Sequence, residues 1–476
     1  MPMPMPMPDQ KPIASVASGA SGRDRDPFLF TPPVPPRSRD WAPIWTAFVG
    51  KRANNSVHGW PEEAFRSFWK TRRVLGYTVH VVSDPDAIGR VLLDNKANYE
   101  RPAVVRNLLS RALGRGLFNA EGDQWRDQRR IVAPTFSPSA VAHFAGDIAT
   151  VVRDRAATWP TRPRRIDMAH EATETTMAIV AATLFDADPR LTTPAAGRHI
   201  TAMLDAAGRA RISALLGLPS LGPGAGRARE GGRFLRETLG AMVDERGPTG
   251  GRDDFLGGLM AALFARYPAA EARELAIDNA VTFYVAGHET TANALTWTIY
   301  LLAAQLKLQE ELRAEAQAAL FTGEARDLEA RLPKLRATLE EAMRLFPPAP
   351  RLDREALADD ELGGYRVAKG DLVSIWPFVV HRHAALWDRP DVFDPDRFMP
   401  ERRAALHRHQ YLPFGAGPRV CVAARFAIVE ALIVLAHWLA ARRFAVTPGQ
   451  RPVPVGRVTL RPEGGMPLTI TTLDDD

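Results

Sequence analysis

The residue that points most directly to chemistry is Cys421, the only cysteine in the chain. It closes the segment Phe-Gly-Ala-Gly-Pro-Arg-Val-Cys, and a long apolar stretch that we predict to be a helix follows it directly. Unpaired N–H groups and the dipole at a helix N-terminus favour a thiolate over a thiol. An inert core residue is the alternative for a lone cysteine. One cysteine also excludes a disulfide framework and every cysteine-rich zinc site.

The rest of this segment suits a large, flat cofactor. Its two glycines let the backbone turn tightly and approach such a group closely. Arg419 places a cation two residues before Cys421. A thiolate with a nearby cation fits an iron porphyrin, whose iron binds sulfur and whose propionate binds arginine. We therefore predict that Cys421 is an iron ligand.

A second set of polar residues, Ala-Gly-His-Glu-Thr-Thr at 286–291, lies inside a predicted long helix. Glycine and β-branched residues are poor helix formers, and a threonine inside a helix can turn its hydroxyl to a backbone carbonyl. A helix loosened at that point has room for water and O₂, whereas the alternative is a kinked core helix without chemistry. A zinc His-Glu-x-x-His motif is excluded, because position 292 is alanine.

Two further pairs of residues lie at helical spacing. Trp125 and Arg129 are four residues apart and share a helix face, on which an indole N–H and a guanidinium suit a carboxylate. Glu341 and Arg344 are three residues apart, a spacing that is common on exposed helices. The second pair gains weight from its place just before the proline-rich segment 346–350.

With these motifs in this order, the chain resembles the cytochrome P-450 family of haem-thiolate monooxygenases. Residues 414–421 match the family's Phe-x-x-Gly-x-Arg-x-Cys loop in every specified position. The resemblance implies that Cys421 is the axial iron ligand of haem b (iron protoporphyrin IX) and that Phe414 and Arg419 also contact this cofactor. Ala423 departs from the family pattern, which usually has glycine two residues after the cysteine.

The resemblance extends to the motif inside the long helix, which matches (Ala/Gly)-Gly-x-(Asp/Glu)-Thr. It implies that Ala286 and Gly287 lie against the haem and that Thr290 hydrogen-bonds the oxygen held at the iron. Glu289 would then belong to a proton relay. Cleaving the O–O bond needs protons delivered through positioned donors, so the reaction requires both side chains.

The remaining motifs receive supporting roles from the same resemblance. Trp125, Arg129 and Arg354 would bind the haem propionates. Glu341, Arg344 and Arg397 would form a buried ionic cluster that supports the cysteine loop; the family pairs the first two with an arginine in a Pro-x-Arg-Phe string, here at 395–398. His381 with His383 and His407 with His409 are candidate metal pairs, but core or surface histidines are the favoured interpretation.

The elements that must position these residues are mostly helices. Apolar periodicity predicts helices over residues 122–133, 166–185, 195–216, 227–246, 254–266, 270–305, 332–346 and 422–443. We also predict a helix from Pro61 to Gly76, a strand over 77–82, a short helix opened by Pro85, and hairpins over 365–375 and 457–471.

The fold class is therefore mainly α with a small β part. The resemblance implies the cytochrome P-450 fold, with the haem buried between the long central helix and the Cys421 helix. Residues 1–27 are rich in Pro, Ser and Gly and are expected to form a disordered tail. Residues 28–476 are expected to form a single haem-thiolate catalytic domain.

Composition restricts partners and location. The chain has 476 residues, 46% of them hydrophobic, and a net charge of only +6 without a long Lys/Arg run, so nucleic acid is not an expected partner. The longest apolar stretch, 427–441, carries Glu430 and His437, so we predict no membrane span. The alternating prolines at the N-terminus forbid a signal helix. We expect a cytoplasmic monomer.

The resemblance implies that the protein hydroxylates or otherwise oxidises a hydrophobic small molecule with O₂ and two electrons. No flavin or nicotinamide motif is visible, so a ferredoxin and a ferredoxin reductase are the expected electron donors. The alternatives are a haem-thiolate peroxygenase or isomerase, which typically lacks the acid–alcohol pair, and a non-enzymatic haem sensor. By family position, the pocket walls lie at 104–113, 218–226, Phe283, Ala286, 349–352 and 465–467, which are mainly apolar.

A basic surface is the expected docking site for the donor. Arg126 and Arg130 lie one turn apart, on a different face from Trp125 and Arg129. Arg402, Arg403 and Arg408 precede the cysteine loop closely. We expect these five cations to lie together on the cysteine side of the haem and to attract an acidic ferredoxin.

Overall fold

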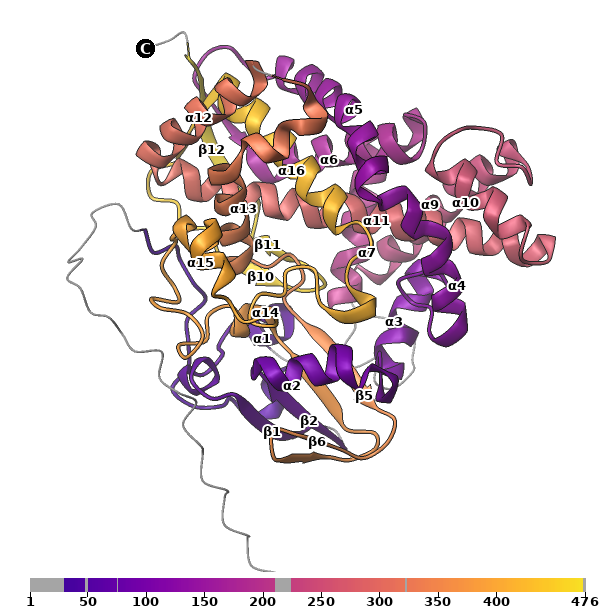
Figure 1. Ribbon diagram of the computed structural model, residues 1–476, viewed down its shortest axis with the longest axis vertical. Helices are drawn as coiled ribbons and strands as arrows, with labels where there is room; N and C mark the ends of the chain where they lie inside the picture. The colour runs from indigo at the N-terminus through magenta and orange to yellow at the C-terminus, as the bar shows by residue number, and fades with distance from the viewer. Residues whose placement is uncertain (1–29, 48–49, 75, 210–223, 322, 474–476) are drawn as a thin grey trace, which may run out of the picture.

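The computed structural model describes residues 30–47, 50–74, 76–209, 224–321 and 323–473. Helices fill most of the molecule, and the largest sheet lies at one end of it (Figure 1). The expected disordered tail over 1–27 lies outside the described residues, as does the greater part of the predicted loop 218–226.

The α-helices within the described ranges differ widely in length. They are α1 (Gly50–Asn54), α2 (Pro85–Gly89), α3 (Ala103–Leu113), α4 (Gly122–Val132), α5 (Pro138–Ala157), α6 (Met168–Leu184), α7 (Pro194–Arg209), α9 (Ala225–Arg246), α10 (Phe255–Phe264), α11 (Ala269–Ala303), α12 (Leu306–Phe321), α13 (Pro333–Leu345), α14 (Pro377–Val380), α15 (Pro400–Ala404) and α16 (Ala424–Ala441).

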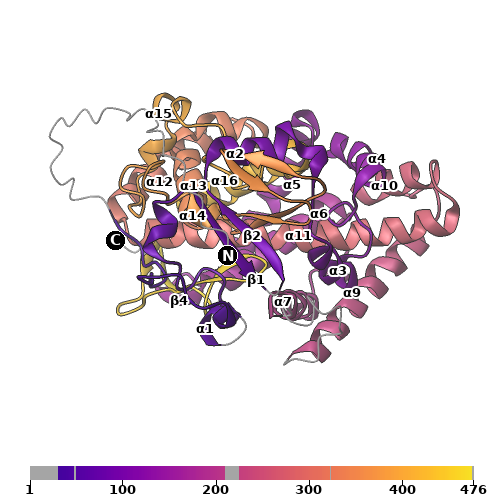
Figure 2. The same cartoon turned by 90° about the horizontal axis from the view of Figure 1, so that it is seen from below.

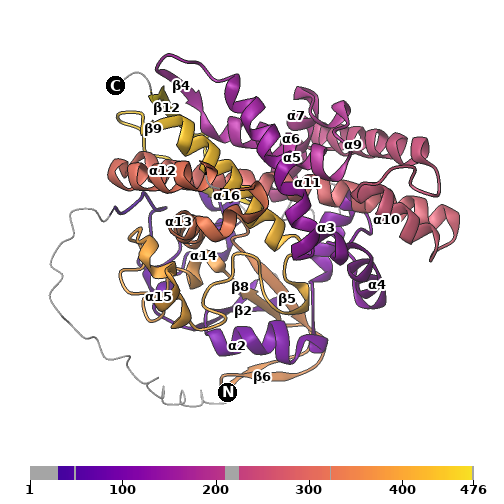
Figure 3. The same ribbon diagram turned by 45° about the horizontal axis from the view of Figure 1, so that its top comes forward.

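The strands form one larger sheet and three small ones. The five-stranded sheet has the order β1 (Trp69–Val74), β2 (Tyr77–Val82), β8 (Leu372–Ile375), β5 (Leu352–Ala356) and β3 (Tyr99–Glu100), and only β2 and β8 are parallel (Figure 3). The others pair β4 (Arg164–Asp167), β12 (Pro467–Thr472) and β9 (Arg442–Val446), then β10 (Pro454–Gly456) with β11 (Leu460–Pro462), and β6 (Asp360–Leu362) with β7 (Tyr365–Val367).

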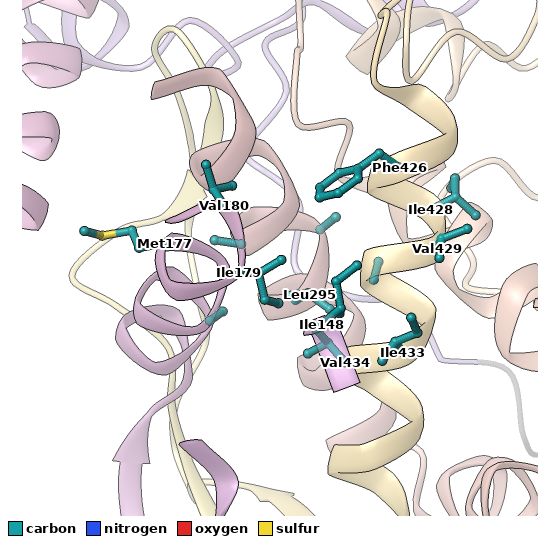
Figure 4. Close-up of a cluster of buried hydrophobic side chains, with 14 of the residues drawn as sticks. Ile148, Met177, Ile179, Val180, Leu295, Phe426, Ile428, Val429, Ile433 and Val434 are labelled. Atoms are coloured by element: carbon teal, nitrogen blue, oxygen red, sulfur yellow. The ribbon is translucent and has the colours of Figure 1, made fainter. Parts of the chain in front are cut away.

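The core is built around α11, which packs against α6, α9, α10, α13 and α16. Figure 4 shows how apolar side chains from several helices meet, among them Ile148 of α5, Ile179 of α6, Leu295 of α11 and Ile433 of α16. Each of these four side chains is fully buried. Burial of one such side chain contributes roughly 1.5–3 kcal/mol, so this apolar contact fixes α11 and α16 relative to each other.

The long helices lie close to their predicted bounds, because their apolar periodicity is strong. The exception is the helix predicted over 166–185, which begins as strand β4; its helical part starts at Met168, where the Asp167 carboxylate accepts a hydrogen bond from the Ala169 N–H. Beyond Arg209, the helix predicted over 195–216 lies outside the described residues. Six of the described helices were not predicted, namely α3, α5 and α12 and the short helices α1, α14 and α15.

The helix predicted from Pro61 to Gly76 is wrong beyond its first turn. A short 3₁₀ segment over Glu62–Phe65 is followed by β1, which pairs with the correctly predicted strand β2. Gly76 makes the turn between them with φ +87°, a conformation that glycine adopts without strain. The short helix that Pro85 opens is confirmed, and Asp84 caps it by accepting from the Asp86 N–H.

Both predicted C-terminal hairpins are also wrong. β7 turns back on β6 through Gly363 and Gly364, whereas β8 joins the large sheet between β2 and β5. Likewise β11 pairs with β10, and β12 pairs with β4 and β9. In both places the first strand of the predicted hairpin pairs with the strand just before it, and the second strand joins a different sheet.

One described helix, α16, is long and apolar enough to cross a membrane by length and composition. Two thirds of it are buried inside the molecule, where it packs against α5, α12 and α13. Its apolar character is accounted for by this place in the core.

Candidate active site

Cys421 lies at the end of a constrained loop that leads into α16. Its N–H donates to the Phe414 carbonyl over 3.0 Å, which closes the loop. Gly417 has φ +69°, and a Cβ at this residue would lie 1.8 Å from the Leu92 carbonyl oxygen. No other residue fits there without moving the backbone, so the glycine brings the loop against the segment that contains Leu92.

The Cys421 thiol is accessible although it lies within the molecule. Burial raises the pKa of this thiol, while the Ala423 N–H and the Arg129 guanidinium lower it. The helix N-terminus favours the thiolate, as the sequence predicts, but burial opposes it. A metal cation bound to the sulfur would offset this cost, because a coordinated thiol is deprotonated outright.

Trp125 and Arg129 both reach the cysteine loop from α4. Arg129 Nη1 donates to the Val420 carbonyl oxygen over 2.9 Å, next to Cys421. The Trp125 ring lies under the Arg419 guanidinium, whose Cζ is 4.6 Å from the ring centroid. The two side chains therefore share a face, as their spacing predicts, and both act on the loop.

Three arginines, Arg101, Arg354 and Arg419, act on one another electrostatically near this loop. Burial lowers the pKa of each, that of Arg101 to about 9, and the neighbouring guanidiniums lower those of Arg101 and Arg354 further. Glu121 is an acid that acts on all three, and it forms an ion pair with Arg419.

Several guanidinium hydrogen bonds in this group go to backbone carbonyls instead of acids. Arg354 Nη1 donates to the Asp353 oxygen over 2.8 Å, and Arg419 Nη1 donates to the Ala120 oxygen over 2.9 Å. Three clustered cations whose common acid is Glu121 alone fit a ligand with two carboxylates, such as haem b with its two propionates. Sequence reasoning missed Arg101, since only the fold brings it to Arg354.

Within the core helix α11, the predicted oxygen-activation motif stands out by its exposure. Ala286 is exposed and Gly287 and Thr290 are half-buried, although the residues around them are buried. Thr290 Oγ1 donates to the Ala286 carbonyl oxygen over 3.0 Å, which is the predicted bond back along the helix. The helix nevertheless stays α-helical over its whole length, so the predicted loosening of the helix is wrong.

Glu289, the neighbour of Thr290, is buried on a different side of α11. Its Oε1 accepts a hydrogen bond from Thr459 Oγ1 over 2.8 Å, and Asn293 also hydrogen-bonds its carboxylate. Arg461 Nη1 lies 3.8 Å from the same oxygen. Burial raises the pKa of Glu289, so its protonated form persists to higher pH than that of an ordinary glutamate. Sequence reasoning missed Thr459 and Arg461.

The ionic cluster predicted behind the cysteine loop is present. Arg344 binds both oxygens of Glu341 over 2.7 and 2.8 Å, and both side chains are fully buried. Arg397 Nε lies 3.6 Å from Glu341 Oε1. The cluster reaches the loop through His381, whose backbone carbonyl accepts from Arg344 and whose Nε2 accepts from the Leu412 N–H.

The histidine pairs make no metal site. Burial lowers the pKa of His381 to about 3 and that of His383 to about 4, so both are neutral core residues. His407 lies 3.1 Å from the Asp86 carboxylate. In the described ranges, no three His, Cys, Asp or Glu side chains come together as metal ligands.

Phe283, a predicted pocket residue, is buried and stacks on Phe136.

Comparisons with known proteins agree on one family. The cytochrome P450 family profile matches residues 35–467. Cyclooctatin synthase of Streptomyces melanosporofaciens is 32% identical over 398 residues, which cover 82% of this chain and 84% of that protein. Cyclooctat-9-en-7-ol 5-monooxygenase of the same organism is 28% identical over 376 residues, covering 78% and 81%.

Solved structures show the same fold. The crystal structure of a cytochrome P450, CYP102L1, superposes with a TM-score of 0.76 at 27% identity and covers 93% of this chain and 100% of that one. The haem domain of cytochrome P450DA superposes with a TM-score of 0.77 at 22% identity, covering 94% and 98%, and shows the fold alone.

Proposed function

From the membership of this chain in the cytochrome P450 family, which makes it a haem-dependent monooxygenase with O₂ as co-substrate, we propose how its residues carry that activity. Cys421 would hold the haem iron through its sulfur. The observation that carries this assignment is an accessible thiol inside the molecule, at the start of α16 and beside a cluster of partly buried arginines.

The chain's own residues hold the cofactor by charge and shape. Arg101, Arg354 and Arg419 bind the propionates, and Glu121 offsets part of their charge. Trp125 orients Arg419 from below, and Arg129 holds the Val420 carbonyl and so fixes the backbone at the ligand. The bound haem supplies the activation of O₂ and the transfer of one oxygen atom to the substrate.

Glu289 and Thr290 handle the protons that this reaction consumes. The raised pKa of Glu289 means that its carboxyl carries a proton near neutrality more readily than an exposed glutamate does. Thr290 holds its hydroxyl at Ala286, at the exposed part of α11. Its oxygen keeps lone pairs that accept a further hydrogen bond, so the hydroxyl can order a water molecule there.

The substrate is a hydrophobic small molecule. The segments expected to line the pocket are mainly apolar, and two relatives carry the names cyclooctatin synthase and cyclooctat-9-en-7-ol 5-monooxygenase. The second name describes an unsaturated alcohol, which supports a mainly hydrocarbon substrate for this chain as well. We place the protein in the cytoplasm as a monomer.

Electrons come from a separate ferredoxin and its reductase. Four of the five expected docking arginines have acid partners: Arg126 pairs with Asp123, and Arg130 lies 3.6 Å from Asp127. Arg402 and Arg403 bind Asp394 and Glu340. These acids reduce the local positive field, so a docking ferredoxin must compete with internal ion pairs.

The test is a reconstituted turnover with isotope-labelled O₂. The haem-loaded protein is mixed with a ferredoxin, its reductase and a panel of apolar compounds, chosen by their displacement of the water at the iron. We expect one labelled oxygen atom in each product molecule, and we expect product formation to depend on the ferredoxin. Product formed only with added peroxide, and without label from O₂, would instead identify a peroxygenase.

A further inference from the structure

Arg461 of β11 lies between acids on two different helices. Its guanidinium forms an ion pair with Asp205 of α7, and its Nη1 lies 3.8 Å from Oε1 of Glu289 on α11. Arg457, in the turn between β10 and β11, binds the same Asp205 over 2.5 Å but has no ion pair with Glu289 among those found in the described chain. Arg461 thus contacts acids on both α7 and α11, whereas Arg457 pairs only with the acid on α7.

The β10–β11 hairpin is joined to α11 by hydrogen bonds. Trp297 Nε1 on α11 donates to the Leu460 carbonyl over 3.3 Å, and Thr459 donates to Glu289. Helix α7 packs along α9 instead (Figure 2). The ion pairs of Asp205 with the two hairpin arginines therefore tie α7 to the element that also contacts Glu289.

The three side chains are mostly shielded from water, which strengthens their interactions. The exposed fractions are 20% for Arg461, 10% for Glu289 and 29% for Asp205. Burial lowers the pKa of Arg461 and raises that of Glu289, so burial disfavours the charged form of each side chain. In the observed arrangement, Asp205 is in direct contact with Arg461 and Glu289 is farther away.

We propose that Arg461 is a positioning residue that couples the place of α7 to the protonation of Glu289. While Asp205 holds the guanidinium, Glu289 keeps its proton. When α7 withdraws Asp205, the guanidinium turns to Glu289 and stabilises its carboxylate. The inference rests on the proposed role of Glu289 in proton delivery, and it adds a device that sets when the proton is available.

Coupling of this kind is reciprocal. An ionised Glu289 competes with Asp205 for Arg461, and so it loosens α7. The other groups near Glu289 do not substitute for Arg461: Thr459 and Asn293 are neutral, and His288 directs Nδ1 to the Tyr284 carbonyl over 2.8 Å. Burial lowers the pKa of His288 to about 4, so this histidine is neutral near pH 7.

The first test measures the protonation of Glu289 directly. The carboxyl stretching band of Glu289, assigned by its loss in Glu289→Gln, is titrated by difference infrared spectroscopy in the full-length protein with and without haem. Asp205→Asn leaves Arg461 to Glu289 alone and should lower the midpoint by about one pH unit. Arg461→Gln should raise it by a similar amount, and Arg461→Lys should restore most of the shift.

The matched control is Arg457→Gln, which removes a cation from Asp205 without touching Glu289. It should speed hydrogen exchange of the α7 amides, as Asp205→Asn does, but leave the Glu289 midpoint unchanged. In the double variant Asp205→Asn/Arg461→Gln, the midpoint should equal that of Arg461→Gln alone, since Asp205 acts through the arginine.

Three results would overturn the proposal: equal midpoints in Asp205→Asn and the unmodified protein, shifts of the same sign in Asp205→Asn and Arg461→Gln, or a shift in Arg457→Gln as large as either. The role of Glu289 itself is tested separately, by product formed per electron pair in Glu289→Gln. An unchanged yield in that variant removes the proton-delivery role, whereas a lowered yield with unmoved midpoints in the Asp205 and Arg461 variants removes only the coupling.

Discussion

At the scale of single residues, the site combines groups whose charged states the bare chain does not favour. Burial opposes the Cys421 thiolate, and it also lowers the pKa values of Arg101, Arg354 and Arg419. A nearby cation would stabilise the buried thiolate, whereas nearby anions would stabilise the three buried guanidiniums. Haem b meets both, because its iron and its propionates carry the complementary charges.

Thr290→Ala tests the acid–alcohol pair. The change removes a hydroxyl whose only hydrogen bond among those found in the described chain goes to the Ala286 carbonyl, so folding and haem content should stay nearly unchanged. Product per electron pair should fall severalfold and peroxide should rise, because proton delivery loses its positioned donor. Both quantities are measured in one turnover assay.

Thr291→Ala is the matched control for this variant. Thr291 is the next residue of α11 and makes the corresponding bond to Gly287, over 3.3 Å, but it is buried. The Thr291→Ala variant should form as much product per electron pair as the unmodified protein. Unchanged yield in Thr290→Ala as well would remove the role of Thr290 and would favour a haem protein that does not activate O₂.

Motif reasoning found the residues that lie close together in the chain and missed those that meet only in space. Cys421, Arg419, Trp125 and Arg129 came from strings and helical spacing. Arg101 and Arg461 stand in no such pattern, because Arg354, Arg419 and Glu289 lie far from them in the chain and only the fold brings them together. Their roles depend on desolvation, which the sequence does not show.

At the scale of elements, the ionic cluster of Glu341, Arg344 and Arg397 supports the cysteine loop. Arg344 joins Glu341 to the carbonyls of His381 and Pro390 over 2.7 Å each, and His381 accepts from the Leu412 N–H, close before the loop. A buried pair of this kind contributes little net stability, but losing one partner leaves an uncompensated charge.

Arg344→Ala should therefore destabilise the protein by about 3–5 kcal/mol. Lys334→Ala on the same helix is the control, because Lys334 pairs with Glu311 at the surface and such pairs contribute about 0–1 kcal/mol. Urea unfolding followed by circular dichroism measures both. Equal losses in the two variants would show that Glu341 is not held as a buried ion.

Helices were predicted well and strands poorly, for a physical reason. A helix such as α11 is stabilised by contacts three and four residues apart, which leave a periodic pattern in the sequence. Strand β8 pairs in parallel with β2, from the other end of the chain, and no local pattern marks that partner. Helix α5 did carry a missed signal, since Ser137 caps it and Pro138 opens it.

At the scale of the whole molecule, the distribution of charge decides how a donor approaches. The net charge of +6 is small, so attraction of an acidic ferredoxin depends on a local surface. Exposed Arg126 and Arg130 lie on α4, the helix that also presents Trp125 and Arg129 to the cysteine loop. Asp123 and Asp127, the acid partners of these two arginines, weaken the positive field at α4 but do not abolish it.

Reversing Arg126 and Arg130 to Glu should slow electron transfer from the ferredoxin at least severalfold at low salt. The difference should shrink as ionic strength rises, because charges are screened over about 10 Å at 0.1 M. Stopped-flow reduction of the haem measures the rate. The peroxide-driven reaction should stay unchanged, since it needs no donor.

The control for this surface reverses two cations on the β part of the molecule, Lys70 of β1 and Arg366 of β7. That variant has the same change in net charge and should keep the rate of the unmodified protein. Equal slowing in both variants, or a rate independent of salt, would show that the α4 surface does not dock the donor.

The central claim, that Cys421 ligates the haem iron of a monooxygenase, is tested most directly by the spectrum of the ferrous carbon monoxide complex. The unmodified protein should show the strongly red-shifted Soret band that thiolate ligation produces. Cys421→Ser should lose this band, while circular dichroism shows that the helices remain. A serine variant that is folded, binds haem and keeps the red-shifted band would contradict the assignment.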